Sequence, residues 1–152
     1  MISIQQQDFI PADEYEALKN SGSSGAIVTF VGLVRDFVGC GRSSHYMYLD
    51  HYPVMTEKVL TEIALQAKRK WQTHRIRIIH RVGELAIGDQ IVFVGVSAGH
   101  RKQAFAACEF IIDFLKTQAP FWKKEDSQWV EANPDDSEKA ASWLDQNEND
   151  LS

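Results

Sequence analysis

Hydrophobic and polar residues are distributed along the chain in segments of strand length. Residues 26–34 (AIVTFVGLV) and 91–98 (IVFVGVSA) are almost continuously apolar, a pattern typical of strands covered on both faces. Residues 75–82 alternate between the two kinds of side chain, and residues 45–52 are rich in aromatics. Both patterns also indicate strands. Together the four segments predict a β-sheet at the centre of the fold.

Two longer segments have the spacing of an amphipathic helix. In residues 54–71 apolar side chains recur four residues apart, at Met55, Val59, Ile63 and Ala67. In residues 100–117 the predicted apolar stripe consists of Ala104, Phe105, Cys108, Ile111, Ile112 and Leu115. Pro120 is expected to end this second helix, because proline has no amide hydrogen to donate. Each helix should therefore bury one face against the sheet.

Shorter elements complete the predicted order. Residues 12–20 resemble a short helix, residues 35–44 a loop, residues 121–132 an edge hairpin and residues 135–146 a last short helix. The resulting order, α-β-β-α-β-β-α-β, predicts an α+β domain whose sheet packs against two long helices. We expect a single domain over residues 1–152.

The composition places the chain among globular proteins. Of its 152 residues, 44% are hydrophobic and 24% are charged, and no apolar run approaches the ~18 residues of a membrane span. The first residues lack the basic start and apolar block of a signal peptide, and two cysteines make no disulfide framework. These features predict a cytoplasmic protein without membrane contact.

Charge is distributed unevenly between the body and the end of the chain. The formal net charge of −5 argues against a generic nucleic-acid binder, which would need a basic surface. Residues 126–152 hold eight acidic residues and one lysine, whereas residues 1–125 hold 15 bases and 13 acids. The body is therefore slightly basic, and we expect the acidic end to be peripheral to function.

Three cationic groups stand at the start of the predicted helix 100–117. His100, Arg101 and Lys102 lie where the helix macrodipole disfavours positive charge by ~0.3–1 kcal/mol each. A sequence built for stability alone would place Ser, Thr or Asp there. Exposed amides together with Arg and His make an anion site, typically for phosphate. The alternative is a solvated basic turn whose penalty salt screens.

Three further cations suggest the rest of a site. Lys116 in the last turn of the helix either complements the helix dipole or reaches a cleft, where partial desolvation would lower its pKa. Lys123 follows after a turn directed by Pro120, and Arg35 ends the predicted strand 26–34. One hypothesis unites these positions: a cationic pocket for a phosphorylated small molecule.

Cysteine and histidine offer little chemistry of their own. Cys108 lies in the apolar stripe and is interpreted as a small core residue. Cys40, between two glycines, has no evident histidine partner and is a weak candidate for a nucleophile. The five histidines lack metal-binding spacing, so no metal site is expected.

Four ordered stretches resemble the large, catalytic subunits of molybdopterin synthase. They are GAIVTFVGLVRD (25–36), LDHYPVMTEKVLTEIA (49–64), IHRVGELAIGDQIVFVGVSAGHR (79–101) and AFAACEFIIDFLKTQAPFWKKE (104–125). The resemblance covers most of residues 25–125, and residues 132–152 match only loosely. It implies an α/β-hammerhead fold with a mixed or antiparallel sheet, and a central homodimer.

The resemblance also implies a reaction and a partner. Each subunit would bind a small ubiquitin-like sulfur carrier whose C-terminal Gly-Gly ends in a thiocarboxylate, giving a heterotetramer. The reaction would convert cyclic pyranopterin monophosphate into molybdopterin by inserting two dithiolene sulfurs. The carrier supplies the sulfur, so neither a cofactor nor a catalytic cysteine is expected.

Residue roles follow by matching motifs. Lys116 in FLKTQAPFW and Lys123 in FWKKE match catalytic lysines that also contact substrate. The other matched substrate-binding positions are Leu33, Val34, Arg35, His100, Arg101, Lys124 and Glu125. Two other interpretations stay open: a non-catalytic module that binds a ubiquitin-like carrier, and an unrelated enzyme acting on phosphate esters.

Overall fold

A computed structural model describes residues 1–19, 22–35, 46–125 and 128–130 of the chain, with the backbone alone for residues 122–125 and 128–130. Cys40, most of the predicted loop 35–44, the predicted helix 135–146 and the acidic segment 132–152 lie outside the described residues.

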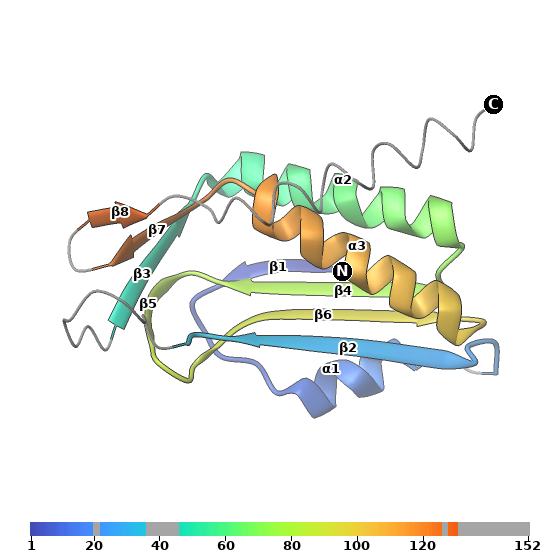
Figure 1. Cartoon of the computed structure of the whole chain (residues 1–152). Helices are drawn as coiled ribbons and strands as arrows, with labels where there is room; N and C mark the ends of the chain where they lie inside the picture. Colours follow the sequence, from blue (N-terminus) through green and yellow to red (C-terminus); the bar gives the residue numbers. More distant parts are fainter. Residues whose placement is uncertain (20–21, 36–45, 126–127, 131–152) are drawn as a thin grey trace.

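The described strands form two four-stranded sheets rather than the one sheet predicted (Figure 1). The first sheet has the order β1 (Ile2–Gln5), β4 (Arg75–Arg81), β6 (Gln90–Ala98) and β2 (Ala26–Leu33). The second has the order β5 (Gly83–Ala86), β3 (Tyr46–His51), β7 (Phe121–Glu125) and β8 (Gln128–Val130). Among the described strands only β1 and β4 pair in parallel, so the first sheet is mixed and the second antiparallel.

The sequence pattern predicted neither β1 nor β5, and it did not separate the two sheets. The reasons are local. β1 and β5 have four residues each, too few to show a period. β5 follows β4 after Val82, and Gly83 has a φ of +88°, a conformation that side chains rarely adopt. The chain changes direction there and leaves the first sheet.

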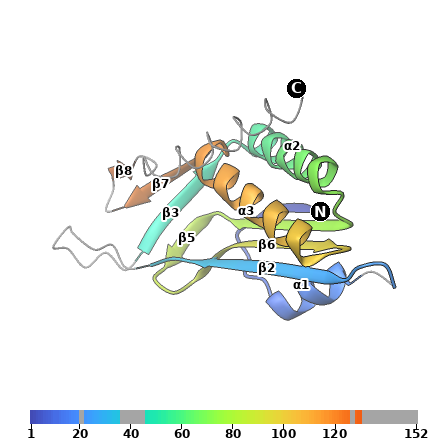
Figure 2. The same cartoon turned by 45° about the vertical axis from the view of Figure 1, so that its right-hand side comes forward.

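Two long helices cover one face of the first sheet, as predicted, and a short helix covers the other (Figures 1 and 2). They are α2 (Pro53–Trp71) and α3 (Arg101–Thr117) on one side and α1 (Pro11–Leu18) on the other. A Cβ at Gly95 would collide with the Leu18 side chain, so this glycine lets α1 approach β6. The predicted α+β class is confirmed.

The predicted helix stripes are correct except at two residues. Phe105 is 62% exposed and Met55 is 59% exposed, although both were assigned to apolar faces. On α3 the buried face instead includes Phe110 and Phe114, and on α2 it includes Leu60. The spacing of apolar residues identifies a face, but the position of the neighbouring element decides where that face is centred.

β2 is less buried than its apolar sequence predicted. It is the edge strand of the first sheet and pairs only with β6 among the described strands. Val28 and Phe30 pack toward α2 and α3, while Ile27 and Val31 pack toward α1. Both faces are thus covered, but one row of backbone hydrogen-bonding groups is unpaired within the described chain, an arrangement that favours pairing with another strand.

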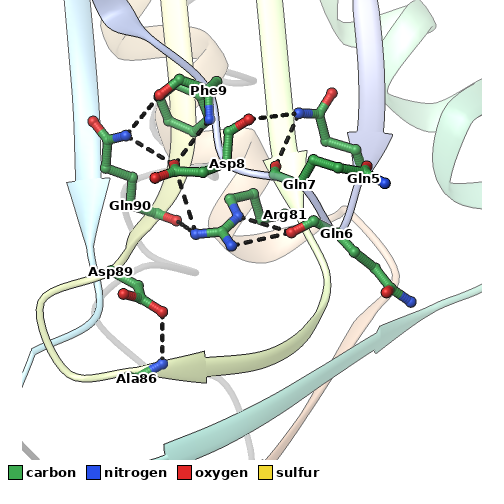
Figure 3. A network of polar contacts seen from close by, with 9 residues as sticks. All are labelled: Gln5, Gln6, Gln7, Asp8, Phe9, Arg81, Ala86, Asp89 and Gln90. Carbon is green, nitrogen blue, oxygen red and sulfur yellow. Dashed lines mark hydrogen bonds and ion pairs between the residues drawn. The ribbon is translucent and has the colours of Figure 1, made fainter.

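Arg81 ties the segment between β1 and α1 to the end of the first sheet (Figure 3). Its guanidinium donates to the Gln6 carbonyl at 3.0 and 3.1 Å and to the Gln90 carbonyl at 2.8 Å. It also lies 3.7 Å from Asp8, whose pKa is lowered by hydrogen bonds from Gln90 and the Phe9 amide and by the Arg81 charge. The Arg81 side chain is only 12% exposed, so its charge depends on these acceptors.

Replacing Arg81 with alanine should lower the free energy of unfolding by about 2–3 kcal/mol, because two backbone carbonyls lose a charged donor and its packing is lost with it. Urea denaturation followed by circular dichroism measures the change. Arg69→Ala is the matched control: its side chain is 70% exposed and its one ion pair among the described residues is with Glu62, so we expect a loss below about 0.5 kcal/mol. Equal losses in the two variants would contradict the role given to Arg81.

Candidate active site

His100 and Arg101 lie at the start of α3, where the sequence placed them. His100 is the N-cap residue, with an extended backbone and no capping hydrogen bond from its side chain, and both residues are exposed. The turn before them is tightly packed: a Cβ at Gly25 would collide with the Gly99 carbonyl oxygen, and the Gly25 amide donates to the Ala98 carbonyl. This close approach holds the start of α3 beside the start of β2.

Lys116 lies in the last turn of α3, as predicted, and its side chain is exposed. The helix ends one residue later, and the Gln118 amide donates to the Phe114 carbonyl as a C-cap. Thr56 of α2 donates from its hydroxyl to the Pro120 carbonyl at 3.0 Å, which fixes the turn that follows. The described residues leave Lys116 exposed.

The turn leads directly into β7, which carries the remaining candidates. The backbones of Lys123, Lys124 and Glu125 pair with Leu49, Tyr48 and Met47 of β3 respectively. Their side chains lie outside the described residues, so the structure fixes only their places along the strand. β7 and β8 form the hairpin predicted for this part of the chain.

Leu33, Val34 and Arg35 lie at the end of β2. Val34 is buried and packs with Met47 and Leu85 of the second sheet, whereas Leu33 is 57% exposed and Arg35 is exposed. The Val34 amide donates to the Asp89 carbonyl at 2.9 Å. Because Val34 and the backbone of Glu125 share the neighbour Met47, the Arg35 end of β2 lies close to the far end of β7.

Within one chain the candidate cations form two groups rather than the single pocket predicted. Arg101 and Lys116 are fifteen residues apart on α3, about 22 Å at the rise of a helix. Arg35 lies beyond the opposite end of β2 from Gly25 and His100, and the strand spans about 23 Å. Arg35 and the two lysine-bearing segments therefore border the second sheet, while His100 and Arg101 lie far from them.

Other candidate chemistry is weak in the part of the chain that the structure describes. Burial raises the pKa of the Cys108 thiol to about 12, helped by the Glu109 charge, which fits an inert core residue. No three His, Cys, Asp or Glu side chains of the described residues are placed to hold a metal ion. A cavity of about 500 Å³ lies against α1 and β4, lined by Leu18, Lys68 and Arg75 among others, and none of the candidate residues lines it. None of the described helices is long and apolar enough to cross a membrane.

Sequence reasoning missed two histidines near the end of α3. His80 of β4 stacks on Phe121, with ring centroids 3.9 Å apart, and His51 of β3 lies 6.4 Å from the same ring. A signal was present for one of them: Ile76 and Ile78 are buried on the helix face of β4, and His80 is the next residue in that row. A polar residue in an apolar row commonly marks a functional position.

Comparison with known proteins identifies the family. The family model described as "MoaE protein" matches residues 4–118. The molybdopterin synthase catalytic subunit of Vibrio cholerae is 51% identical over 146 residues, covering 93% of this chain and 97% of the relative. A solved molybdopterin biosynthesis MoaE protein from Burkholderia ambifaria aligns with a TM-score of 0.82 and 47% identity, covering 93% of this chain and 96% of that one.

A more distant solved structure has the same fold. It is a protein–protein complex of subunits 1 and 2 of molybdopterin-converting factor from Helicobacter pylori, and it aligns with a TM-score of 0.71 and 21% identity over 88% of this chain and 90% of that one. The family model and the high identity over nearly the whole chain agree with the four motifs of the sequence. The chain therefore belongs to the MoaE protein family, the family of molybdopterin synthase catalytic subunits.

Proposed function

We propose that the chain catalyses the formation of the molybdopterin dithiolene, taking two sulfurs from a thiocarboxylated ubiquitin-like carrier. The observation that carries this proposal is the position of Lys116, exposed at the end of α3 and one short turn before the strand that carries Lys123. The short turn between α3 and β7 brings the segments that carry Lys116 and Lys123 to one end of the second sheet, and in this family both lysines match catalytic positions. The reaction takes place in the cytoplasm, as the cysteine usage suggests.

The two lysines act on charge that develops during sulfur transfer. When the anionic thiocarboxylate sulfur bonds to a carbon of the pterin side chain, negative charge passes from the sulfur to the oxygen whose bond to that carbon breaks, and water then hydrolyses the thioester to leave sulfur on the pterin and a carboxylate on the carrier. A preorganised ammonium group stabilises the charge on that oxygen most when bulk water is excluded. Lys116 is exposed in the part of the chain that the structure describes, and in the proposed complex the bound carrier tail and substrate exclude water. Arg35, His100 and Arg101 hold the substrate's phosphate, for which paired N–H donors are well suited.

A second copy of the chain is needed to bring these phosphate ligands together. β2 is an apolar edge strand of eight residues with one unpaired row of backbone groups in the described structure. A two-fold axis near its middle would pair it antiparallel with β2 of a second copy, as the commonest form of homodimer allows. Such pairing places the end of one β2 beside the start of the other.

Pairing of the two β2 strands would bring together residues that lie far apart within one chain. Arg35 follows the end of β2, and His100 lies beside its start through the contact of Gly25 with Gly99. In the symmetric pair, Arg35 of one subunit would lie next to His100 of the partner subunit. Each complete site would then combine Arg35 and the two lysines of one subunit with two cations of the other.

The carrier partner is proposed by analogy with the family. The Helicobacter pylori structure holds two subunits of a molybdopterin-converting factor in complex. A carrier on each copy of the homodimer gives the heterotetramer that the sequence motifs implied. The rival interpretation, a carrier-binding module without catalysis, leaves the exposed cations at both ends of α3 without a role.

Mass spectrometry of the complete mixture tests the activity. Thiocarboxylated carrier, cyclic pyranopterin monophosphate and this protein are expected to give a product that has gained two sulfurs. Carrier that ends in an ordinary carboxylate is the control and should give no product. Carrier binding without any gain in mass would favour the non-catalytic module instead.

A further inference from the structure

The chain passes from α3 to the second sheet beside a stacked pair of rings. Phe121 is the first residue of β7. The centroids of its ring and of the His80 ring lie 3.9 Å apart, and the two ring planes make an angle of 20°. His80 belongs to β4 of the first sheet, and Phe121 belongs to the second. The pair therefore connects the two sheets at the point where the chain leaves α3.

Two further contacts hold the same point. His51 lies opposite Phe121 in the β3–β7 ladder, with ring centroids 6.4 Å apart. The Nδ1 atom of His51 is buried and has no hydrogen-bond partner among the described residues, so this ring is held by packing there. The Thr56 hydroxyl of α2 donates to the carbonyl of Pro120, the residue before Phe121. The start of β7 is thus fixed by β3, β4 and α2 together.

The side chain of His80 is a neutral aromatic ring rather than a charged group. Its Nδ1 donates to the Arg81 carbonyl at 2.9 Å. Burial of the ring lowers the pKa of His80 to about 4, and the Arg81 contact opposes this shift while the nearby His51 adds to it. The neighbours of His80 in the sheet, Ile4 and Val92, carry no charge. The imidazole is therefore neutral at neutral pH and stacks like a second aromatic side chain.

We propose that His80, Phe121 and His51 are positioning residues for sulfur transfer, which set the place of β7 and of Lys123 relative to Lys116. The inference rests on the proposed function. α3 is packed against the first sheet, whereas β7 is hydrogen-bonded to β3 of the second, so the spacing of the two lysine-bearing segments depends on how the sheets are joined. These three rings join the sheets where β7 begins, whereas the packing of Val34 on Met47 and Leu85 joins them near the other end of β7.

The size of the expected effect follows from the geometry of catalysis. Misplacing a catalytic group by about 1 Å can cost on the order of 10²-fold in rate. His80→Ala removes the ring on which Phe121 stacks, and we expect the rate of dithiolene formation in the bound complex to fall about 10- to 100-fold. His80→Phe keeps a stacking ring without the imidazole nitrogens, and this variant should stay within about threefold of wild type.

The matched control is His74→Ala. His74 is a partly buried histidine just before β4, and it contacts the Ser24 hydroxyl at 2.8 Å at the opposite end of the strand. Two measurements are made on the full-length wild type and the three variants. Hydrogen exchange reports the protection of β7 and β3 against that of β6, and single-turnover kinetics with thiocarboxylated carrier report sulfur transfer.

The proposal expects His80→Ala alone to increase exchange in β7 and β3 more than in β6 and to slow turnover. It is overturned if His80→Ala is no slower than His74→Ala, if exchange rises equally in both sheets, or if His80→Phe is as slow as His80→Ala. Should His80→Ala fail to fold, Phe121→Leu removes the other ring of the stack and is judged by the same outcomes. If wild type makes no product at all, the proposed function fails, whereas the exchange data still decide whether these rings hold β7.

Discussion

Replacing Lys116 with alanine is expected to lower the rate of dithiolene formation at least about 100-fold. Removing one preorganised group from a site of developing negative charge costs on the order of 10²–10³ in rate. Because Lys116 is exposed at the end of α3, the free energy of unfolding should change by no more than about 0.5 kcal/mol. Single-turnover mass spectrometry and urea denaturation, run on the same preparation, measure both quantities.

Lys68→Ala is the matched control for this experiment. Lys68 is also an exposed lysine in the last turn of a long helix, α2, but it lies outside the candidate site. We expect the control to turn over at the wild-type rate. The comparison separates the effect of removing any lysine from the end of a helix from the effect of removing a catalytic lysine. Turnover by Lys116→Ala at the wild-type rate would show that Lys116 is not a catalytic residue.

The second large effect is the recovery of activity when two inactive variants are mixed. One variant carries Lys116→Ala, and the other carries His100→Ala together with Arg101→Ala. If each site combines residues of two subunits, half of the randomly mixed dimers contain one site with every cation present. Activity should then recover to about one quarter of wild type, since each such dimer has one intact site of two.

A different mixture provides the control. Lys116→Ala and Lys123→Ala affect the same subunit's share of a site, so their mixed dimers contain no intact site and should stay inactive. Native mass spectrometry establishes that subunits have exchanged in both mixtures. Exchange without recovery in the first mixture would show that the two groups of cations do not meet across the dimer.

Secondary structure was predicted well where a segment is long enough to show its own period. α2 and α3 begin and end within one residue of the predicted ranges, and β6 begins one residue earlier than predicted. These elements bury one face or both, so their apolar spacing follows directly from helix and strand geometry. The same argument fails for β1 and β5, whose four residues each are too few to establish a repeat.

Burial was predicted less well, because it depends on neighbours. Phe105 fits the spacing of the α3 stripe, yet it is 62% exposed because no described element covers that side of the helix start. β2 has the composition of a central strand but lies at the edge of the sheet. An apolar edge strand that the described part of one chain leaves unpaired is itself a reason to expect a second copy.

The sequence by itself determined the family, the two long helices, most strands and the identity of the candidate site residues. These follow from residue types and their local spacing, which the chain carries whatever its tertiary structure. Only the tertiary structure decided how the candidates are arranged. Rigid elements hold His100 and Lys116 at opposite ends of α3, and Arg35 and His100 beyond opposite ends of β2. The contact of His80 with Phe121 was likewise invisible in the sequence, because it joins residues of two sheets that lie together only after both have formed.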